Sequence, residues 1–392
     1  MTDYSPPVSR PGTEPPTIAN EQTLPSEQQV GLLEPVAYFH GAMPTGVTVS
    51  HKGRIFVNFP KWGDEVAFTV AEIISGEGKT VPYPDNEINQ TDPNDLGATL
   101  MSVQSVVVDP ADRLWILDTG SPMFQPTKYG GPKLVCVDLE TDKVAKKILF
   151  PQNVALPTTY LNDIRFDLRR GKEGVAYITD SSQNGSNGII VVDLSSGESW
   201  RKLDNHPSTK SEDIQSFLPI VEGRPFVVKQ QQEKNRSVKL AADMGSDGIA
   251  ISSTGELLYY CPLASRNLYS VTTEALIDRS LDDQSVSQSV HEEGDKGGAS
   301  DGLESDAEGC VYVTNYEHNS ILRRNLRGEW ETIVHDPRLL WPDTLSLACD
   351  GYLYVTANQL HRQARFHNGQ DLRIKPYTLF RINVGAKPVL LR

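Results

Sequence analysis

The sequence is poor in features typical of secreted, membrane-spanning and nucleic-acid-binding proteins. Its 392 residues include four cysteines, and no two of them have the CxxC spacing of a metal or redox motif. No apolar run approaches the roughly 18 residues that a membrane helix needs. Because Lys and Arg total 37 against 51 Asp and Glu, the net charge of −14 disfavours duplex nucleic acid and anionic membrane surfaces as partners.

The N-terminal segment lacks the apolar core of a secretory signal peptide. Residues 1–30 are rich in Pro, Ser, Thr and Glu without periodicity, so we expect a flexible tail there, followed by a single domain over residues 31–392. Each cysteine lies in or beside an apolar run, which indicates buried free thiols in a reducing compartment. The sequence therefore predicts a cytoplasmic location.

What the sequence does contain is a sixfold internal repeat of β-type segments. Short runs of Val, Ile, Leu and Tyr alternate with Gly, Pro, Asp and Asn turns from about residue 35 onward, and helical periodicity is scarce. In five of the six repeats a Gly or Asp stands eight residues after an aligned polar residue, where a tight hairpin turn needs positive φ. The repeats are 44–59, 103–119, 161–180, 246–261, 300–314 and 342–356.

The spacing leaves room for about four strands in each repeat, which predicts an all-β fold, a six-bladed β-propeller. A blade cannot bury both faces alone, so the ring must close. We expect a strand near residues 35–40 to pair with the C-terminal strand at 378–384. Two polar insertions, 202–215 and 279–299, interrupt the pattern, and we expect a flexible surface loop at 279–299.

The aligned polar residues should form a ring at one mouth of the central channel, because the innermost strand of each blade lines that channel. Three ring carboxyls would repel one another unless protons, water or a cation separate them. Oxygen ligands suit Ca²⁺ or Mg²⁺, and a channel filled by water or by a ligand is the alternative. The ring residues are Thr45, Gln104, Asn162, Asp247, Asp301 and Asp343, of which Asn162, Asp247 and Asp301 are the candidate metal ligands.

The segments after each second strand should overhang the ring and form a small-molecule pocket with aromatic walls. His318 and His361 are candidate proton-transfer groups, because histidine titrates near neutrality, although a structural role is the alternative for each. Tyr316 and Lys61 are further candidate catalytic residues. The candidate ligand-binding residues are Trp62, Gln104, Phe124, Asn162, Asp180, Asp247, Asp301, Asp343 and Asn358.

Five motifs stand out in the second strands and in the segments beside them: LWILDTG (114–120), YLNDIRFD (160–167), AYITDSS (176–182), VYVTNYEHNSI (311–321) and GYLYVTANQLHR (351–362). These motifs resemble the yellow and major royal jelly protein family. The resemblance spans most of residues 40–385, with the motifs in the family's order, and it implies a six-bladed propeller. Insect members convert dopachrome or bind small amines, whereas this chain looks like a signal-less, microbial-type member.

A more distant similarity is to the SMP-30/gluconolactonase propellers. Their divalent metal is held by a Glu, an Asn and Asp residues at the starts of inner strands, which Asn162, Asp247 and Asp301 match. The Glu of the first blade has no counterpart, because Thr45 and Gly46 stand at that position. This departure puts a lactonase-type metal site in doubt.

The lack of a recognisable nucleophile or redox-cofactor motif favours an enzyme of secondary metabolism that isomerises, tautomerises or cyclises a small molecule. The substrate would be a conjugated, quinone-like or otherwise reactive intermediate, and the cyclisation could be a cycloaddition. Such chemistry needs a shaped pocket, a hydrogen-bond donor and at most one base, with no required cofactor. The two alternatives are a non-catalytic binder of an aromatic or amine ligand and a divalent-metal-dependent lactonase.

Overall fold

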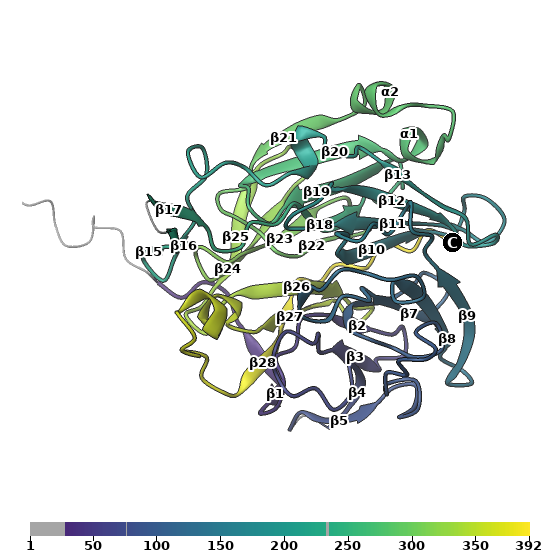
Figure 1. The fold of residues 1–392 in the computed structure, drawn as a ribbon, viewed down its shortest axis with the longest axis horizontal. Helices are drawn as coiled ribbons and strands as arrows, with labels where there is room; N and C mark the ends of the chain where they lie inside the picture. The colour runs from purple at the N-terminus through teal and green to yellow at the C-terminus, as the bar shows by residue number, and fades with distance from the viewer. Residues whose placement is uncertain (1–27, 76, 233–234) are drawn as a thin grey trace, which may run out of the picture.

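Six four-stranded antiparallel sheets surround a common centre in the part of the chain that the structure describes (Figure 1). The structure is a computed structural model and describes residues 28–75, 77–232 and 235–392. The innermost strand of each sheet contacts the innermost strands of its two neighbours, and the sixth contacts the first. The prediction of an all-β, six-bladed propeller is therefore confirmed.

Within each blade the strands follow one another from the channel outward. Blades 1 to 3 contain β2 (Val47–Val49), β3 (Ile55–Asn58), β4 (Val70–Ser75) and β5 (Lys79–Pro82); β6 (Val103–Val108), β7 (Arg113–Asp118), β8 (Lys133–Asp138) and β9 (Lys143–Leu149); and β10 (Leu161–Asp167), β11 (Val175–Asp180), β12 (Gly188–Asp193) and β13 (Ser199–Lys202). Blades 4 to 6 contain β18 (Ser246–Ile251), β19 (Leu257–Pro262), β20 (Asn267–Thr272) and β21 (His291–Asp295); β22 (Leu303–Ser305), β23 (Val311–Asn315), β24 (Ser320–Arg324) and β25 (Trp330–His335); and β26 (Pro342–Leu347), β27 (Tyr352–Ala357), β28 (Tyr377–Asn383) and β1 (Glu34–Phe39).

The ring is closed by pairing the two ends of the domain within one blade. Strand β1 is the outermost strand of blade 6 and runs antiparallel to β28, with Ala37 opposite Leu379. The expected pairing of residues 35–40 with 378–384 is confirmed. Opening the ring at this blade would break a backbone ladder and expose Phe39, so the closure holds the circle together.

The hairpin turns between the first and second strands have the predicted left-handed backbone. Positive φ is present in five blades, where it lets the chain reverse within two residues. The values are 83° at Gly53, 60° at Asp112, 74° at Gly255, 95° at Gly309 and 89° at Gly351.

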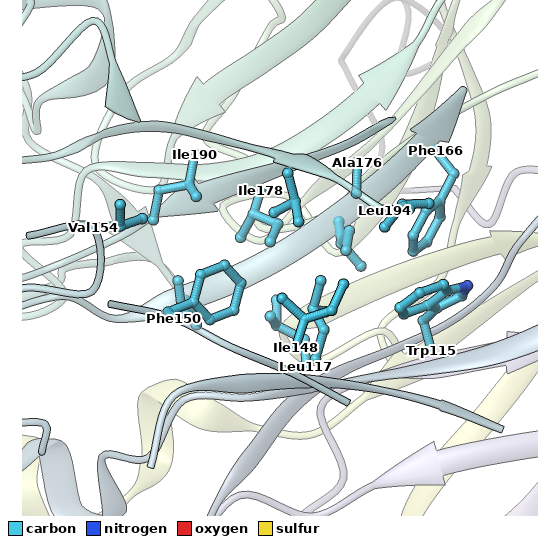
Figure 2. Close-up of a cluster of buried hydrophobic side chains, with 14 of the residues drawn as sticks. Trp115, Leu117, Ile148, Phe150, Val154, Phe166, Ala176, Ile178, Ile190 and Leu194 are labelled. Atoms are coloured by element: carbon cyan, nitrogen blue, oxygen red, sulfur yellow. The ribbon is translucent and has the colours of Figure 1, made fainter. Parts of the chain in front are cut away.

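Neighbouring blades are joined by apolar side chains that interdigitate between their faces. Between blades 2 and 3, Trp115 packs against Phe166 with ring centroids 5.4 Å apart (Figure 2). Ile178 lies in the same cluster and is 0% exposed. Strands β8 and β12 are rich in Val, Ile and Leu, because both of their faces are buried between blades.

The expectation of a flexible loop at 279–299 is wrong, because regular elements occupy this segment. It contains α2 (Asp283–Ser287) and β21, the outer strand of blade 4, and α1 (Thr273–Ile277) precedes it. The sequence of β21, HEEGD, is polar on both faces, as an exposed edge strand tolerates. It therefore lacks the apolar alternation by which strands are recognised in a sequence.

A second insertion, between blades 3 and 4, reaches over the channel. It contains the 3-10 helix η3 (Pro207–Thr209) and two hairpins, β14 (Ile220–Val221) with β15 (Arg224–Pro225) and β16 (Val227–Gln232) with β17 (Asn235–Leu240). Its apolar side chains Phe217, Val221 and Phe226 belong to a buried cluster with Tyr160 and Trp341, which lie beside the ring residues in sequence.

Most of the expected N-terminal tail, residues 1–27, lies outside the described residues. Val30 exchanges two backbone hydrogen bonds with His335, at 3.1 and 3.0 Å, so the end of the segment assigned to the tail is tied to blade 5. Cys136 and Cys261 are buried free thiols, and Cys310 and Cys349 are partly exposed ones. Among the described residues, none of the helices combines the length and apolarity needed to cross a membrane.

We expect Ile178→Ala to lower the free energy of unfolding by about 2–5 kcal/mol, because it leaves a cavity between two blades. Urea unfolding followed by tryptophan fluorescence measures this loss. Val144→Ala, at the exposed edge strand β9, is the matched control and should cost less than about 1 kcal/mol. Equal losses in the two variants would contradict an interface that depends on packing.

Candidate functional site

Five of the six ring residues converge on the channel as the repeats predict. Gln104, Asn162, Asp247, Asp301 and Asp343 line one cavity of about 10 Å³, room for the centre of about one water molecule. The sixth, Thr45, has its hydroxyl in the wall. It donates to the Gln104 carbonyl at 3.3 Å and accepts from Asn58 Nδ2 at 2.8 Å.

The ring residues point into the channel because they lie on irregular strand starts. The β10–β11 register shifts between Leu161 and Ile164, and similar shifts flank Gln104, Asp247 and Asp343. A bulge of this kind lets two consecutive side chains face one side of a sheet, whereas a regular strand alternates them. Asn162 and Asp163 therefore both line the cavity.

Glycine follows the ring residue where the strands approach one another most closely. A Cβ at Gly248 would lie 2.4 Å from the Asp301 carbonyl oxygen, and one at Gly302 would lie 2.3 Å from that of Asp343. Both distances are far inside van der Waals contact. In each of these two Asp-Gly pairs, the aspartate places a carboxyl in the channel and the glycine leaves room for the neighbouring inner strand.

Burial raises the pKa of each of the three ring carboxyls. The pKa of Asp301 rises to about 6, and those of Asp247 and Asp343 rise well above their usual range. The neighbouring Asp301 carboxyl raises the pKa of Asp247 further, and repulsion from Asp343 adds to this effect. Each of these carboxyls therefore opposes the ionisation of its neighbour, as in coupled acid pairs.

Neighbouring donors fix the ring carboxyls. Trp341 Nε1 donates to Asp301 Oδ2 at 2.7 Å, and Asn358 Nδ2 donates to Asp343 Oδ2 at 2.6 Å. The Asn162 amide donates to Asp247 Oδ1. Each ring acid therefore has a defined orientation.

This donor arrangement fits a divalent ion poorly. Asn162 turns its N–H group, rather than its oxygen, toward Asp247, and Asp301 already accepts the Trp341 indole. Within the described ranges no three or more His, Cys, Asp and Glu side chains are grouped as a metal site needs. The ring residues fit protons and one water molecule better than Ca²⁺ or Mg²⁺.

One side of the mouth above the ring is built on Trp341. Its indole stacks on Tyr316 at 4.1 Å between centroids with 7° between the planes, and His361 stacks nearby at 5.8 Å and 20°. Phe226 from the insertion meets the Trp341 indole edge-on at 5.4 Å. Trp341 thus joins Asp301 to a buried aromatic cluster.

A second set of aromatic rings connects the mouth to Gln104. Trp62 Nε1 donates to the Tyr160 hydroxyl at 2.8 Å, and this hydroxyl donates to Gln104 Oε1 at 3.1 Å. Phe124 stacks on Tyr160 at 4.8 Å, and the Arg365 guanidinium lies 4.9 Å from the Phe124 ring centroid. The predicted ligand-binding residues Trp62 and Phe124 thus lie in one aromatic group.

His361 lies at the mouth, in the 3-10 helix η4 (Leu360–Arg362). Its Nε2 is 2.8 Å from Glu222 Oε2, on the β14–β15 turn. Burial lowers the pKa of His361, and the neighbouring Glu222 carboxylate partly offsets this effect. The imidazole is therefore neutral at pH 7 and able to accept a proton.

The other three predicted catalytic residues are placed differently. Tyr316 donates its hydroxyl to the Leu263 carbonyl at 2.8 Å, and burial raises its pKa well above the usual value, so it packs under Trp341. Lys61 Nζ donates to Thr91 Oγ1 at 3.0 Å, and burial lowers its pKa. His318 is exposed and lines a polar groove of about 830 Å³, which Glu222 and Arg362 also line.

Asp180 and Asn358, both predicted to bind ligand, make internal hydrogen bonds at the ends of second strands. Asp180 pairs with Arg201 at 2.9 Å and accepts the Tyr160 backbone N–H. Asn358 links Asp343 to the Pro44 carbonyl. These side chains hold the starts of the inner strands in place.

Several residues of the site are not among the predicted ones. Tyr160 and Trp341 each stand two residues before a ring residue, so the repeat alignment contained a signal for them. Asp163 and Arg165 form a buried ion pair at 2.9 Å next to the cavity. Glu222 comes from the insertion, where no repeat pattern could mark it.

The comparisons with known proteins agree with this architecture. A sequence model described as "Major royal jelly protein" matches residues 101–379. The chain belongs to the major royal jelly protein family. The resemblance of its motifs to that family is thereby confirmed.

Two similar relatives show how far the family match extends. Major royal jelly protein 7 of Apis mellifera is 30% identical over 201 residues, which are 50% of this chain and 40% of that protein. Protein yellow of Drosophila melanogaster is 28% identical over 253 residues, which are 62% of this chain and 43% of that protein. The match thus spans about two fifths of the length of these relatives.

Solved structures share the fold at low sequence identity. A calcium-binding regucalcin from Agrobacterium tumefaciens has a TM-score of 0.53 at 13% identity, covering 91% of this chain and 99% of that one. A gluconolactonase from Xanthomonas campestris has a TM-score of 0.53 at 12% identity, covering 91% of each chain. This likeness confirms the similarity to gluconolactonase-type propellers in fold, and a fold does not determine function.

We expect the stability of the wild type to fall relative to that of Asp301→Asn as the pH rises. The folded-state pKa of about 6 exceeds the usual 3.8, so the native state binds more protons between these values. Protonated Asp301 contributes about 3 kcal/mol to the free energy of unfolding. This contribution is fully present below about pH 4 and is lost as the pH rises through 6.

Urea unfolding of both proteins at pH 4, 5, 6 and 7 measures this difference. Asp213→Asn, at an exposed carboxyl, is the control and should follow the wild type. Parallel profiles for wild type and Asp301→Asn would show that the buried Asp301 carboxyl is ionised throughout.

Proposed function

We propose that the protein is an enzyme that binds a conjugated small molecule at the channel mouth and isomerises, tautomerises or cyclises it. The observation that carries this proposal is the acid pair Asp247 and Asp301 beneath the Trp341 indole. A buried carboxyl that keeps its proton near neutral pH is a hydrogen-bond donor for a carbonyl oxygen. The surrounding aromatic rings suit a flat, apolar substrate.

The acid pair supplies the donor that such a reaction needs. A carboxyl of this pair that retains its proton donates it in a hydrogen bond to a quinone-like carbonyl oxygen and stabilises the negative charge that develops there. The site lies among buried aromatic side chains, where an electrostatic interaction is stronger than in water. Electron density moves within the conjugated substrate, so no external reductant or oxidant enters the reaction.

His361 supplies the base for a tautomerisation. The neutral imidazole takes a proton from the substrate while the acid pair supports the carbonyl oxygen. Return of that proton to another atom of the same substrate completes an isomerisation and leaves His361 unchanged. A ring closure would use the acid pair and the shape of the pocket alone.

Two other functions make different demands on the same residues. A binder of an aromatic amine would pair its ammonium group with ionised ring carboxyls and consume nothing. A metal-dependent lactonase is favoured by the convergence of Asn162, Asp247 and Asp301 on one cavity. The hydrogen-bond directions within the ring favour the proton-dependent enzyme instead.

The first test is a screen of quinones, quinone methides and conjugated enones, followed by loss of their absorbance. We expect turnover of at least one class, with Asp301→Asn and His361→Ala lowering kcat by about 10²- to 10⁴-fold. His291→Ala, on the exposed edge strand β21, is the matched histidine control and should keep the wild-type rate. Binding without turnover would support the binder, and neither binding nor turnover would contradict a site at this mouth.

Chelation separates the lactonase from the proposed enzyme. We expect the melting temperature and the turnover to be the same in EDTA and in added Ca²⁺ or Mg²⁺. A cation bound to the native state at 100 times its Kd would stabilise the fold by about 2.7 kcal/mol. A fall in melting temperature with EDTA, reversed by one cation and abolished in Asp301→Asn, would favour the lactonase.

A further inference from the structure

The two ring nitrogens of His361 have different surroundings. Nε2 lies 2.8 Å from Glu222 Oε2, whereas Nδ1 is buried without a hydrogen-bond partner among the described residues. The residue as a whole is 4% exposed. Buried polar atoms without partners are rare and costly in folded proteins, so an unpaired Nδ1 indicates a position that a ligand atom or a water molecule completes.

Glu222 reaches His361 from an unusual backbone position. It is the first central residue of the two-residue turn between β14 and β15, with φ of 49° at Glu222 and 72° at Gly223. Such turns favour Asn, Asp or Gly at both positions, because other side chains are strained there. Strain of this kind persists where the surrounding contacts hold it, and it marks candidate functional positions.

Within the described residues, the hydrogen-bond partners of the Glu222 carboxylate belong to η4. Its carboxylate accepts from His361 Nε2 and from Arg362, whose Nε lies 2.9 Å away. These hydrogen bonds lower the pKa of Glu222, so it is ionised at neutral pH. The remaining titratable neighbour is His367, whose ring nitrogen faces the backbone carbonyl of His361 at 2.9 Å.

An ionised carboxylate only accepts hydrogen bonds, and this fixes the tautomer of His361. The proton of the neutral imidazole must lie on Nε2, which leaves the lone pair on Nδ1. The Trp341 indole stacks on this ring, and Phe226 meets it edge-on at 6.4 Å. The lone pair therefore lies among aromatic side chains, where a donor from the ligand meets little competition from water.

We propose that Glu222 is a positioning residue that holds His361 as the Nε2–H tautomer, so that Nδ1 accepts a hydrogen bond from a hydroxyl group of the ligand. The proposal rests on the proposed function, since it places the ligand at the same mouth. It narrows the ligand class to conjugated molecules with a phenolic or enolic O–H. Ethers of the same shape lack this O–H donor, so we expect them to bind more weakly.

The tautomer is tested by nitrogen NMR of the full chain with ¹⁵N-labelled histidine, at pH 7. We expect the His361 signals of a protonated Nε2 and an unprotonated Nδ1. Glu222→Gln offers an N–H donor as well as an acceptor, and should allow the Nδ1–H tautomer. Arg362→Gln removes the other partner of the carboxylate but should leave the tautomer unchanged.

A wild-type protein with the proton on Nδ1 would overturn the proposal, as would a Glu222→Gln variant with an unaltered tautomer. Glu222→Asp retains a carboxylate on a shorter side chain. If this carboxylate still reaches Nε2, the variant should keep the wild-type nitrogen signals. A merely structural Glu222 would change the melting temperature of Glu222→Gln and Arg362→Gln alike and leave the nitrogen signals as they are.

Ligand recognition is tested with 2-naphthol and its methyl ether, 2-methoxynaphthalene, by fluorescence titration. We expect 2-naphthol to bind the wild type about fivefold to tenfold more tightly than the ether. This preference should be lost in Glu222→Gln and kept in Arg362→Gln. Equal binding of the two probes to the wild type would overturn the hydroxyl recognition.

The two experiments separate this inference from the function on which it rests. Absence of binding by either probe, together with the expected tautomer, would contradict an aromatic site at the mouth and with it the hydroxyl recognition. Turnover of a quinone by a protein with the opposite tautomer would support the enzyme and overturn the role of Glu222.

Discussion

The convergence of six inner strands on one axis is the constraint on which the rest of the structure depends. Equivalent residues of all blades must share one narrow space, so each strand start is shaped for it. Bulges turn the side chains inward, and Gly248 and Gly302 let the strands approach. Three carboxyls in that space cannot all be ionised without a cation, and burial raises their pKa values so that protons remain.

The region above the ring is built by side chains that stand just before the ring residues and by the insertion between blades 3 and 4. Trp341 and Tyr160 precede ring residues and carry aromatic rings above the channel, and the insertion between blades 3 and 4 packs Phe226 against them. The result is a set of buried proton donors beneath apolar walls, with His361 at the side. In the proposed function, a ring carboxyl that retains its proton polarises a carbonyl group of the substrate.

Much of the fold is readable in the sequence, because its causes are local. Alternating apolar residues predict strands, and a Gly or Asp eight residues after the ring position predicts the hairpin turn. The ring itself follows from aligning the repeats. Contacts between distant segments are not readable in this way: Asp180 pairs with Arg201, and Glu222 meets His361 across 139 residues of chain. The polar strand β21 escaped recognition because it has no apolar face.

The most direct measurement of the central claim is the protonation of the ring carboxyls in the folded protein. Carbon-13 NMR of aspartate side chains, with Asp247→Asn, Asp301→Asn and Asp343→Asn for assignment, would follow each carboxyl from pH 4 to pH 8. We expect at least one of the three to remain protonated at pH 7, and Asp301 to titrate near pH 6. Three carboxyls that are fully ionised at pH 5 would contradict this expectation and would indicate that a cation holds the ring.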